Sequence, residues 1–159
     1  MKHPNKYFME KAIDEAKKAV LEGNYAVGAL MVVKDEIITI QHTTIHTLRN
    51  PTKHGDILAI SEASRILNSI YIPEGYLYTT LEPCPMCTSA AIFAKIKGII
   101  YGASMQDAKK VFYEKGLGLY DWRQIDISAK YVIDKGTPKI ELYPEFMRDE
   151  CIKLFDMNK

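Results

Sequence analysis

The stretch Pro83-Cys84-Pro85-Met86-Cys87, together with His54-Gly55-Asp56 earlier in the chain, is the most informative part of this sequence. One imidazole and two thiols give three protein ligands, the number that leaves a tetrahedral zinc ion with one open position for water. A carboxylate two residues after the histidine could carry protons to and from that water. The spacing therefore predicts a hydrolytic metal site and not a closed structural one.

Pro85 indicates that the two cysteines lie where a strand gives way to a helix. Proline disfavours helical geometry in the residue before it and is well tolerated in the first helical turn. We therefore expect Cys84 near the helix cap and Cys87 one turn inside, at the positive end of the helix, which favours thiolates. His54 is expected at the start of the preceding helix, so that two helix N-termini meet around one ion.

Length and composition suit one soluble domain spanning residues 1–159. The chain has 47% hydrophobic and 26% charged residues, and its formal charge is +1 from 21 basic and 20 acidic side chains. This balance gives little support for extensive phosphate binding and disfavours a nucleic-acid partner, without excluding a local basic patch. No membrane span or secretory signal is visible, and three cysteines, two of them clustered, favour a reduced, cytoplasmic protein.

Hydrophobic periodicity and chain breakers predict strands that alternate with helices, which implies an α/β layered domain. Residues 43–53 are typical of a loop, whereas residues 106–136 mix helical pattern, glycines and aromatics and give no clear assignment. The expected helices cover residues 5–22, 56–67, 85–94 and 144–155, and the expected strands cover residues 26–33, 37–41, 77–80, 98–103 and 139–143.

Other interpretations of the cysteine pair stay open. A Cys-x-x-Cys pair also occurs as a redox couple or as half of a four-ligand structural zinc site. The third cysteine, Cys151, lies in an expected amphipathic helix, where a buried small apolar residue is the ordinary interpretation. The histidines outside the motif are typical of loop and surface residues; they are His3, His42 and His46.

The two motifs resemble the zinc-dependent cytidine deaminase superfamily, and the similarity covers about residues 5–115. Within it, the chain is most similar to the bacterial guanine deaminase and tRNA adenosine deaminase branch. Asn50-Pro51-Thr52 and the segment from Tyr143 to Phe155 favour the guanine deaminase side, while the glycine of His54-Gly55-Asp56 is similar to fungal cytosine deaminase. Further similar stretches are Gly28-Ala29, Thr80-Leu81-Glu82-Pro83 and Tyr101-Gly102.

The resemblance implies a three-layer α/β/α sandwich around a five-stranded mixed sheet, with homodimers common. It implies that His54, Cys84 and Cys87 bind one Zn²⁺ per chain and that Asp56 is the proton shuttle. It also implies a backbone amide donor at Gly55 for the metal-activated water. The Glu82 carbonyl would accept a hydrogen bond from the departing amine.

Three positions depart from the superfamily pattern. The usual shuttle is a glutamate, and the shorter arm of Asp56 loses about 1.5 Å of reach, one C–C bond. The usual substrate-binding asparagine is replaced by Thr43, followed by Thr44, and the aromatic that often precedes Gly28-Ala29 is replaced by Val27. The first change bears on catalytic competence, and the other two bear on the substrate.

The leading hypothesis is a hydrolytic deaminase of a free nucleobase or a related small aminated heterocycle, with guanine as the first guess. The alternatives are a tRNA-editing adenosine deaminase and a zinc-binding protein of the same fold that has lost catalysis. Two features of the unassigned segment have ordinary explanations, as packing aromatics and as a solvated basic face. A stacking wall or active-site cover is the less favoured role for Tyr113, Tyr120 and Trp122, and Lys109, Lys110 and Lys115 form a mildly basic stretch that is best explained as a solvated face.

Overall fold

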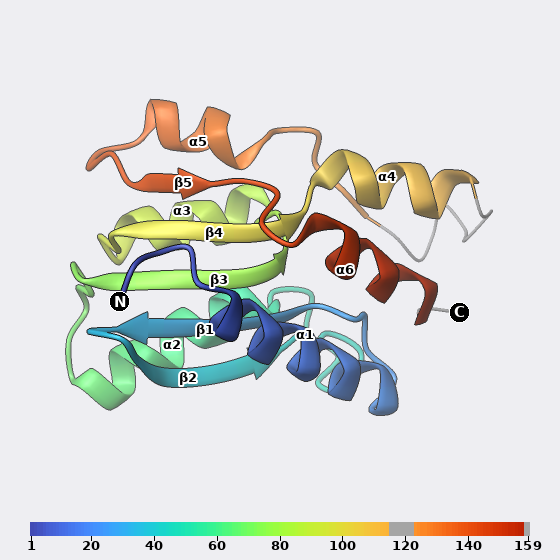
Figure 1. Cartoon of the computed structure of the whole chain (residues 1–159), viewed down its shortest axis with the longest axis horizontal. Helices are drawn as coiled ribbons and strands as arrows, with labels where there is room; N and C mark the ends of the chain where they lie inside the picture. The colour runs from blue at the N-terminus through green and yellow to red at the C-terminus, as the bar shows by residue number, and fades with distance from the viewer. Residues whose placement is uncertain (115–122, 158–159) are drawn as a thin grey trace.

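In the computed structural model, which describes residues 1–114 and 123–157, a five-stranded sheet lies between two layers of helices (Figure 1). The strand order is β2-β1-β3-β4-β5. β1 is antiparallel to β2 and β3, whereas β3, β4 and β5 run parallel, so the sheet is mixed as predicted. The strands are β1 (Gly28–Val33), β2 (Glu36–His42), β3 (Gly75–Leu81), β4 (Gly98–Ala103) and β5 (Glu141–Tyr143).

Two hydrophobic clusters join the helices to opposite faces of the sheet. β1 shows the alternation, because Leu30 and Val32 pack with α1, α4 and α6, while Ala29 and Met31 pack with α2, α3 and α5. No helix in the described part of the chain is long and apolar enough to cross a membrane. The helices are α1 (Lys6–Leu21), α2 (Gly55–Leu67), α3 (Pro85–Phe93), α4 (Met105–Glu114), α5 (Ala129–Lys135) and α6 (Arg148–Lys153), followed by a 3-10 turn, η1 (Leu154–Met157).

The expected final helix over residues 144–155 begins later than predicted. Glu145 and Met147 have positive φ angles of 58° and 54°, a left-handed geometry that an α-helix does not contain. The chain therefore turns before α6 begins at Arg148. The segment without a clear assignment, residues 106–136, contains most of α4 and all of α5.

Gly28 allows α1 to approach β1 more closely than any side chain would permit. A Cβ at this position would overlap the backbone oxygen of Ala12 and would stand 2.7 Å from the backbone nitrogen of Ala16. Backbone atoms of a helix cannot swing aside as the end of a side chain can. A methyl group at Gly28 would therefore push α1 away from the sheet.

We expect Gly28→Ala to lower the free energy of unfolding by about 3 kcal/mol or more, the upper end of the usual cost of overpacking. Gly55→Ala is the matched control, because its Cβ would stand 3.3 Å from the nearest backbone atoms of His42 and Thr43, a tight but tolerable contact. Urea unfolding of both variants measures the difference. Equal stability of the two variants would contradict the close approach.

His42, the last residue of β2, is held between two glutamates of the α1 region. Its Nδ1 lies 2.7 Å from Glu15 Oε1, and its Nε2 lies 2.7 Å from Glu22 Oε2. Burial disfavours the charged ring, but the hydrogen bonds with Glu15 and Glu22 outweigh burial and raise the pKa of His42 above 6.5. The charged ring thus fixes the end of β2 against α1.

Because the folded-state pKa of His42 is raised, its contribution to stability is full below pH 6.5 and is lost as the pH rises through the raised value. The free energy of unfolding of the zinc-loaded protein should therefore fall between about pH 6 and about pH 8. His42→Asn should flatten this fall. Urea titrations of both proteins across the range provide the measurement, and identical pH profiles would show that the pair of glutamates does not stabilise the ring.

Candidate metal centre

The three expected metal ligands lie at two neighbouring helix N-termini. His54 is the N-cap of α2 and Cys84 is the N-cap of α3, both with extended backbone. Pro85 is the first residue of α3, as predicted, and Cys87 lies in the first turn, fully buried. The cap positions direct these side chains toward the space where the two helices begin.

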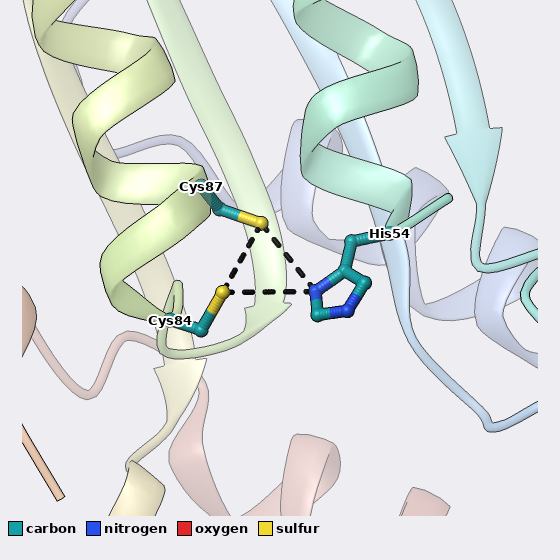
Figure 2. A group of neighbouring side chains, drawn as sticks. All are labelled: His54, Cys84 and Cys87. Carbon is teal, nitrogen blue, oxygen red and sulfur yellow. Dashed lines mark hydrogen bonds between the residues drawn. The ribbon is translucent and has the colours of Figure 1, made fainter. Parts of the chain in front are cut away.

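Figure 2 shows the imidazole of His54 facing the two sulfurs of α3. His54 Nδ1 lies 3.7 Å from Cys84 Sγ and 3.5 Å from Cys87 Sγ, and the sulfurs are 3.6 Å apart. Tetrahedral zinc with ordinary bond lengths separates two sulfurs by about 3.8 Å and a sulfur from a nitrogen by about 3.6 Å. The triangle therefore fits one zinc ion.

The remaining residues that the structure describes provide no fourth side-chain ligand. Within residues 1–114 and 123–157, His54, Cys84 and Cys87 form the one group of three or more potential ligand residues. Cys151 is buried in α6, where its sulfur packs against Gly102 of β4. Cys84 and Cys87 are free thiols, without a disulfide. The donor set is thus the three-ligand type that keeps one coordination position for water or substrate.

The electrostatics of the triangle favour a thiolate. Hydrogen bonding from Cys87, with further support from His54, lowers the pKa of Cys84 to about 4 against the opposing effect of burial. Zinc binds thiolates and neutral imidazole, so a thiol that ionises easily is a suitable ligand.

Asp56 lies beside the triangle, in the first turn of α2, with only 4% of its surface exposed. Burial and the nearby Cys84 charge raise its pKa to about 6, and hydrogen bonding from Thr79 opposes that rise only in part. Among the described residues, nothing forms a hydrogen bond with Asp56 Oδ1. Asp56 Oδ1 is thus a buried acceptor beside the metal site, and it is suited to accept a proton from water or substrate.

Two of the ligands, His54 and Cys84, line one cavity of about 350 Å³ together with Asp56. This volume lies at the lower end of the range of about 300–1,000 Å³ typical of small-molecule sites. Apolar side chains form most of the wall, so polar contacts to a ligand are few and directional. The other lining residues are Tyr25, Val27, Thr43, Ile45, Pro51, Leu81, Glu82, Met86, Met105, Arg123, Gln124 and Ile125.

Three residues expected near the substrate have different surroundings. Thr43 lines the cavity, and its Oγ1 accepts the Gly55 N–H at 3.4 Å, so in this structure that amide bonds to the threonine. Val27 also lines the cavity, and its carbonyl accepts the Thr43 N–H. Thr44 is not among the cavity residues, and its buried Oγ1 has no partner within the described part of the chain. Thr43 is therefore the better placed of the two threonines.

The Glu82 side chain connects three elements around the cavity. Its carboxylate accepts the Met105 N–H at 2.8 Å and the Ala129 N–H at 3.0 Å, so it fixes the starts of α4 and α5. The expected role of its carbonyl toward a leaving amine stays a prediction. Its side chain has a structural role that the sequence did not reveal.

The aromatics for which a cover was the less favoured role do not add to the described site. Tyr113 is exposed on α4 and does not line the cavity, while Tyr120 and Trp122 lie outside the described residues. Lys109 pairs with Asp126 at 2.9 Å, and Lys115 lies outside the described residues. The wall formed by residues 123–125 was missed, because no motif marks this segment.

We expect Cys84→Ala and His54→Ala to lose the bound zinc, because two ligands rarely hold this ion against dialysis. Cys151→Ala is the matched control, since it removes a buried thiol away from the triangle. Metal analysis of protein purified without chelator gives the stoichiometry, expected to be one zinc per chain in the wild type and the control. Stoichiometric zinc in Cys84→Ala would contradict the ligand assignment.

Comparisons with known proteins agree with this geometry. Residues 2–103 match the family model of the cytidine and deoxycytidylate deaminase zinc-binding region. The tRNA-specific adenosine deaminase of Aquifex aeolicus (strain VF5) is 43% identical over 97 residues, which span 61% of this chain and 64% of that enzyme. Guanine deaminase of Bacillus subtilis (strain 168) is 30% identical over 124 residues, 77% of this chain and 78% of that enzyme.

A solved structure from a study of A-to-I editing by tRNA:A34 deaminases at the wobble position of transfer RNA has a TM-score of 0.78 and 25% identity. The superposition covers 94% of this chain and 99% of that chain. The superposition supports the three-layer arrangement, and the matched residues 2–103 include all three candidate ligands. The chain therefore belongs to the cytidine and deoxycytidylate deaminase zinc-binding family.

Proposed function

We propose that this chain is a zinc-dependent hydrolytic deaminase that converts adenosine presented by tRNA to inosine. The observation that carries the proposal is the position of Asp56, whose buried carboxyl lines the same cavity as the metal donors of His54 and Cys84. The choice of substrate rests on the Aquifex aeolicus relative, which is tRNA-specific and is 43% identical over the aligned residues. Composition and local motifs placed a free nucleobase first and tRNA adenosine second, and this choice reverses that order.

In this proposal Asp56 moves the protons of the reaction. When bound by His54, Cys84 and Cys87, zinc would supply the nucleophile by lowering the pKa of its water toward about 7. Asp56 takes one proton from the attacking water and delivers it to a ring nitrogen; it then takes the remaining hydroxyl proton and delivers it to the amino group, which leaves as ammonia. A carboxyl with a pKa of about 6 can both accept and donate near neutral pH.

The Asp56 side chain is one methylene shorter than the glutamate usual in the superfamily, and this difference is the main physical argument against full activity. A misplacement on the order of 1 Å can cost about 100-fold in rate. Two features offset this loss here: Asp56 is at the first turn of a rigid helix, and its Oδ1 has no bond to the described protein residues that would hold it away. We therefore assign the proton shuttle to Asp56 and not to a spectator role.

A free guanine-type base is the second candidate. The cavity of about 350 Å³ is small, and the Bacillus subtilis guanine deaminase aligns with a larger share of this chain than the Aquifex aeolicus enzyme does.

The proposal also includes a homodimer and a cytoplasmic location. Analytical ultracentrifugation would test the homodimer.

A substrate panel separates these candidates. Zinc-loaded protein should form inosine in tRNA and should release little ammonia from free guanine, adenine or cytosine. Guanine as the one good substrate would overturn the tRNA proposal in favour of the second candidate. Absence of turnover on every substrate would favour a zinc-binding protein of this fold without catalysis.

We expect Asp56→Asn to lower kcat by about 100-fold or more, because removal of a general acid–base group usually costs about 10²–10⁴. The variant should keep its zinc, since Asp56 is not a ligand. Asp56→Glu restores the arm length usual in the superfamily and should retain measurable activity. Wild-type turnover by zinc-loaded Asp56→Asn would show that another group moves the protons.

A further inference from the structure

Arg123 is the exposed cation on the cavity wall. It lies outside residues 2–103, so the family match does not assign it a role. Arg123 lines the same cavity as the metal ligands His54 and Cys84. A molecule that fills the cavity is therefore within reach of the guanidinium.

The segment that follows Arg123 is anchored at two points, Asp126 and Ala129. Asp126 accepts from Gln106 Nε2 at 3.1 Å and from Lys109 Nζ at 2.9 Å, which fixes the segment to α4. The Glu82 carboxylate holds Ala129 at the start of α5. These bonds position the Arg123 backbone beside the cavity while its side chain stays exposed.

The other charged groups of the cavity have protein partners or face the metal site. Glu82 accepts two backbone N–H groups, and His54 contacts the two thiols. Among the described residues, Arg123 is engaged in no ion pair or hydrogen bond with a side chain or backbone group. An arginine that is positioned but unpaired at a cavity opening is suited to an anionic ligand group.

We infer that Arg123 binds a phosphate group of the nucleotide whose base enters the cavity. This inference rests on the proposed function, and it explains how a chain with a net charge of only +1 recognises a phosphate-bearing substrate. The cavity admits a base, so the attached sugar and phosphate remain at the opening, beside Arg123. The planar guanidinium donates two parallel hydrogen bonds to phosphate oxygens, a geometry that lysine does not reproduce.

Binding measurements test this inference independently of turnover. The probe is a fluorescein-labelled RNA stem–loop with an unpaired adenosine, titrated by anisotropy at several salt concentrations. Unlabelled 5′-AMP, adenosine and inorganic phosphate then compete for the site. The proteins are zinc-loaded wild type, Arg123→Gln, Arg123→Lys, and Arg65→Gln, which removes the same charge from an exposed arginine of α2 outside the cavity.

Arg123→Gln should weaken RNA binding about tenfold or more, the usual effect of losing a charge-assisted hydrogen bond. The slope of log affinity against log salt should fall by about 0.7–0.9, the value for one phosphate contact. The advantage of 5′-AMP over adenosine should disappear, Arg123→Lys should retain part of the affinity, and Arg65→Gln should match the wild type. An effect on RNA and 5′-AMP together indicates a phosphate on the nucleotide itself, and an effect on RNA alone indicates a neighbouring phosphodiester.

Three results would overturn the phosphate assignment: equal binding by Arg123→Gln and Arg65→Gln, an equal loss for adenosine and 5′-AMP, or no RNA or 5′-AMP binding by the wild type. The proposed function fails separately, through the deamination panel. If Arg123→Gln loses phosphate-dependent affinity but the wild type does not deaminate RNA, the phosphate contact stands and the target base is wrong. If wild type and Arg123→Gln deaminate and bind RNA equally, the function stands and the phosphate contact fails.

Discussion

The meeting of two helix N-termini at one edge of the sheet is the constraint on which the site depends. β1 is antiparallel to both β2 and β3, so β2 and β3 run in the same direction and end at the same edge. The chain leaves β2 toward α2 and leaves β3 toward α3, and both helices therefore begin at that edge (Figure 1). His54 and Cys84 occupy the cap positions of these two helices, so strand direction brings an imidazole and a thiol together across 30 residues. Rigid caps place ligands more accurately than loops would.

A buried carboxylate provides the second constraint. Glu82 follows β3 directly, and its two oxygens bind backbone N–H groups at the starts of α4 and α5. Two backbone donors would be left without an acceptor if this carboxylate were absent, at a cost of about 1–3 kcal/mol each. Glu82, two residues before Cys84, thus connects the metal ligands with the starts of α4 and α5. This connection explains why a charged side chain is stable at a position that is 8% exposed.

The sequence predicted those features that depend on local chemistry. Pro85 fixed the start of α3, the His-x-Asp and Cys-x-x-Cys spacing identified the donor triangle, and the apolar run over residues 26–33 indicated the buried strand β1. Features that depend on distant contacts were not predictable. The cavity residues 123–125 are held in place by Asp126, which bonds to α4. The late start of α6 follows from left-handed backbone geometry at Glu145 and Met147, neither of which is a glycine. Net charge was similarly uninformative about the substrate, because a chain-wide sum of +1 does not reveal that a cation, Arg123, lines the cavity.

The two polar departures from the superfamily pattern act on the same side of the cavity. Thr43 replaces a longer asparagine and Asp56 replaces a longer glutamate, and the Gly55 N–H bond to Thr43 Oγ1 places the threonine beside the residue that precedes Asp56. Thr43 and Asp56 both line the cavity, and a shorter side chain at each position would leave more room beside His54 and Cys84. A ring that sits deeper would recover the reach that Asp56 lacks, without any displacement of α2. The pairing of the two changes is therefore physically consistent with retained proton transfer, whereas loss of catalysis would place no constraint on Thr43.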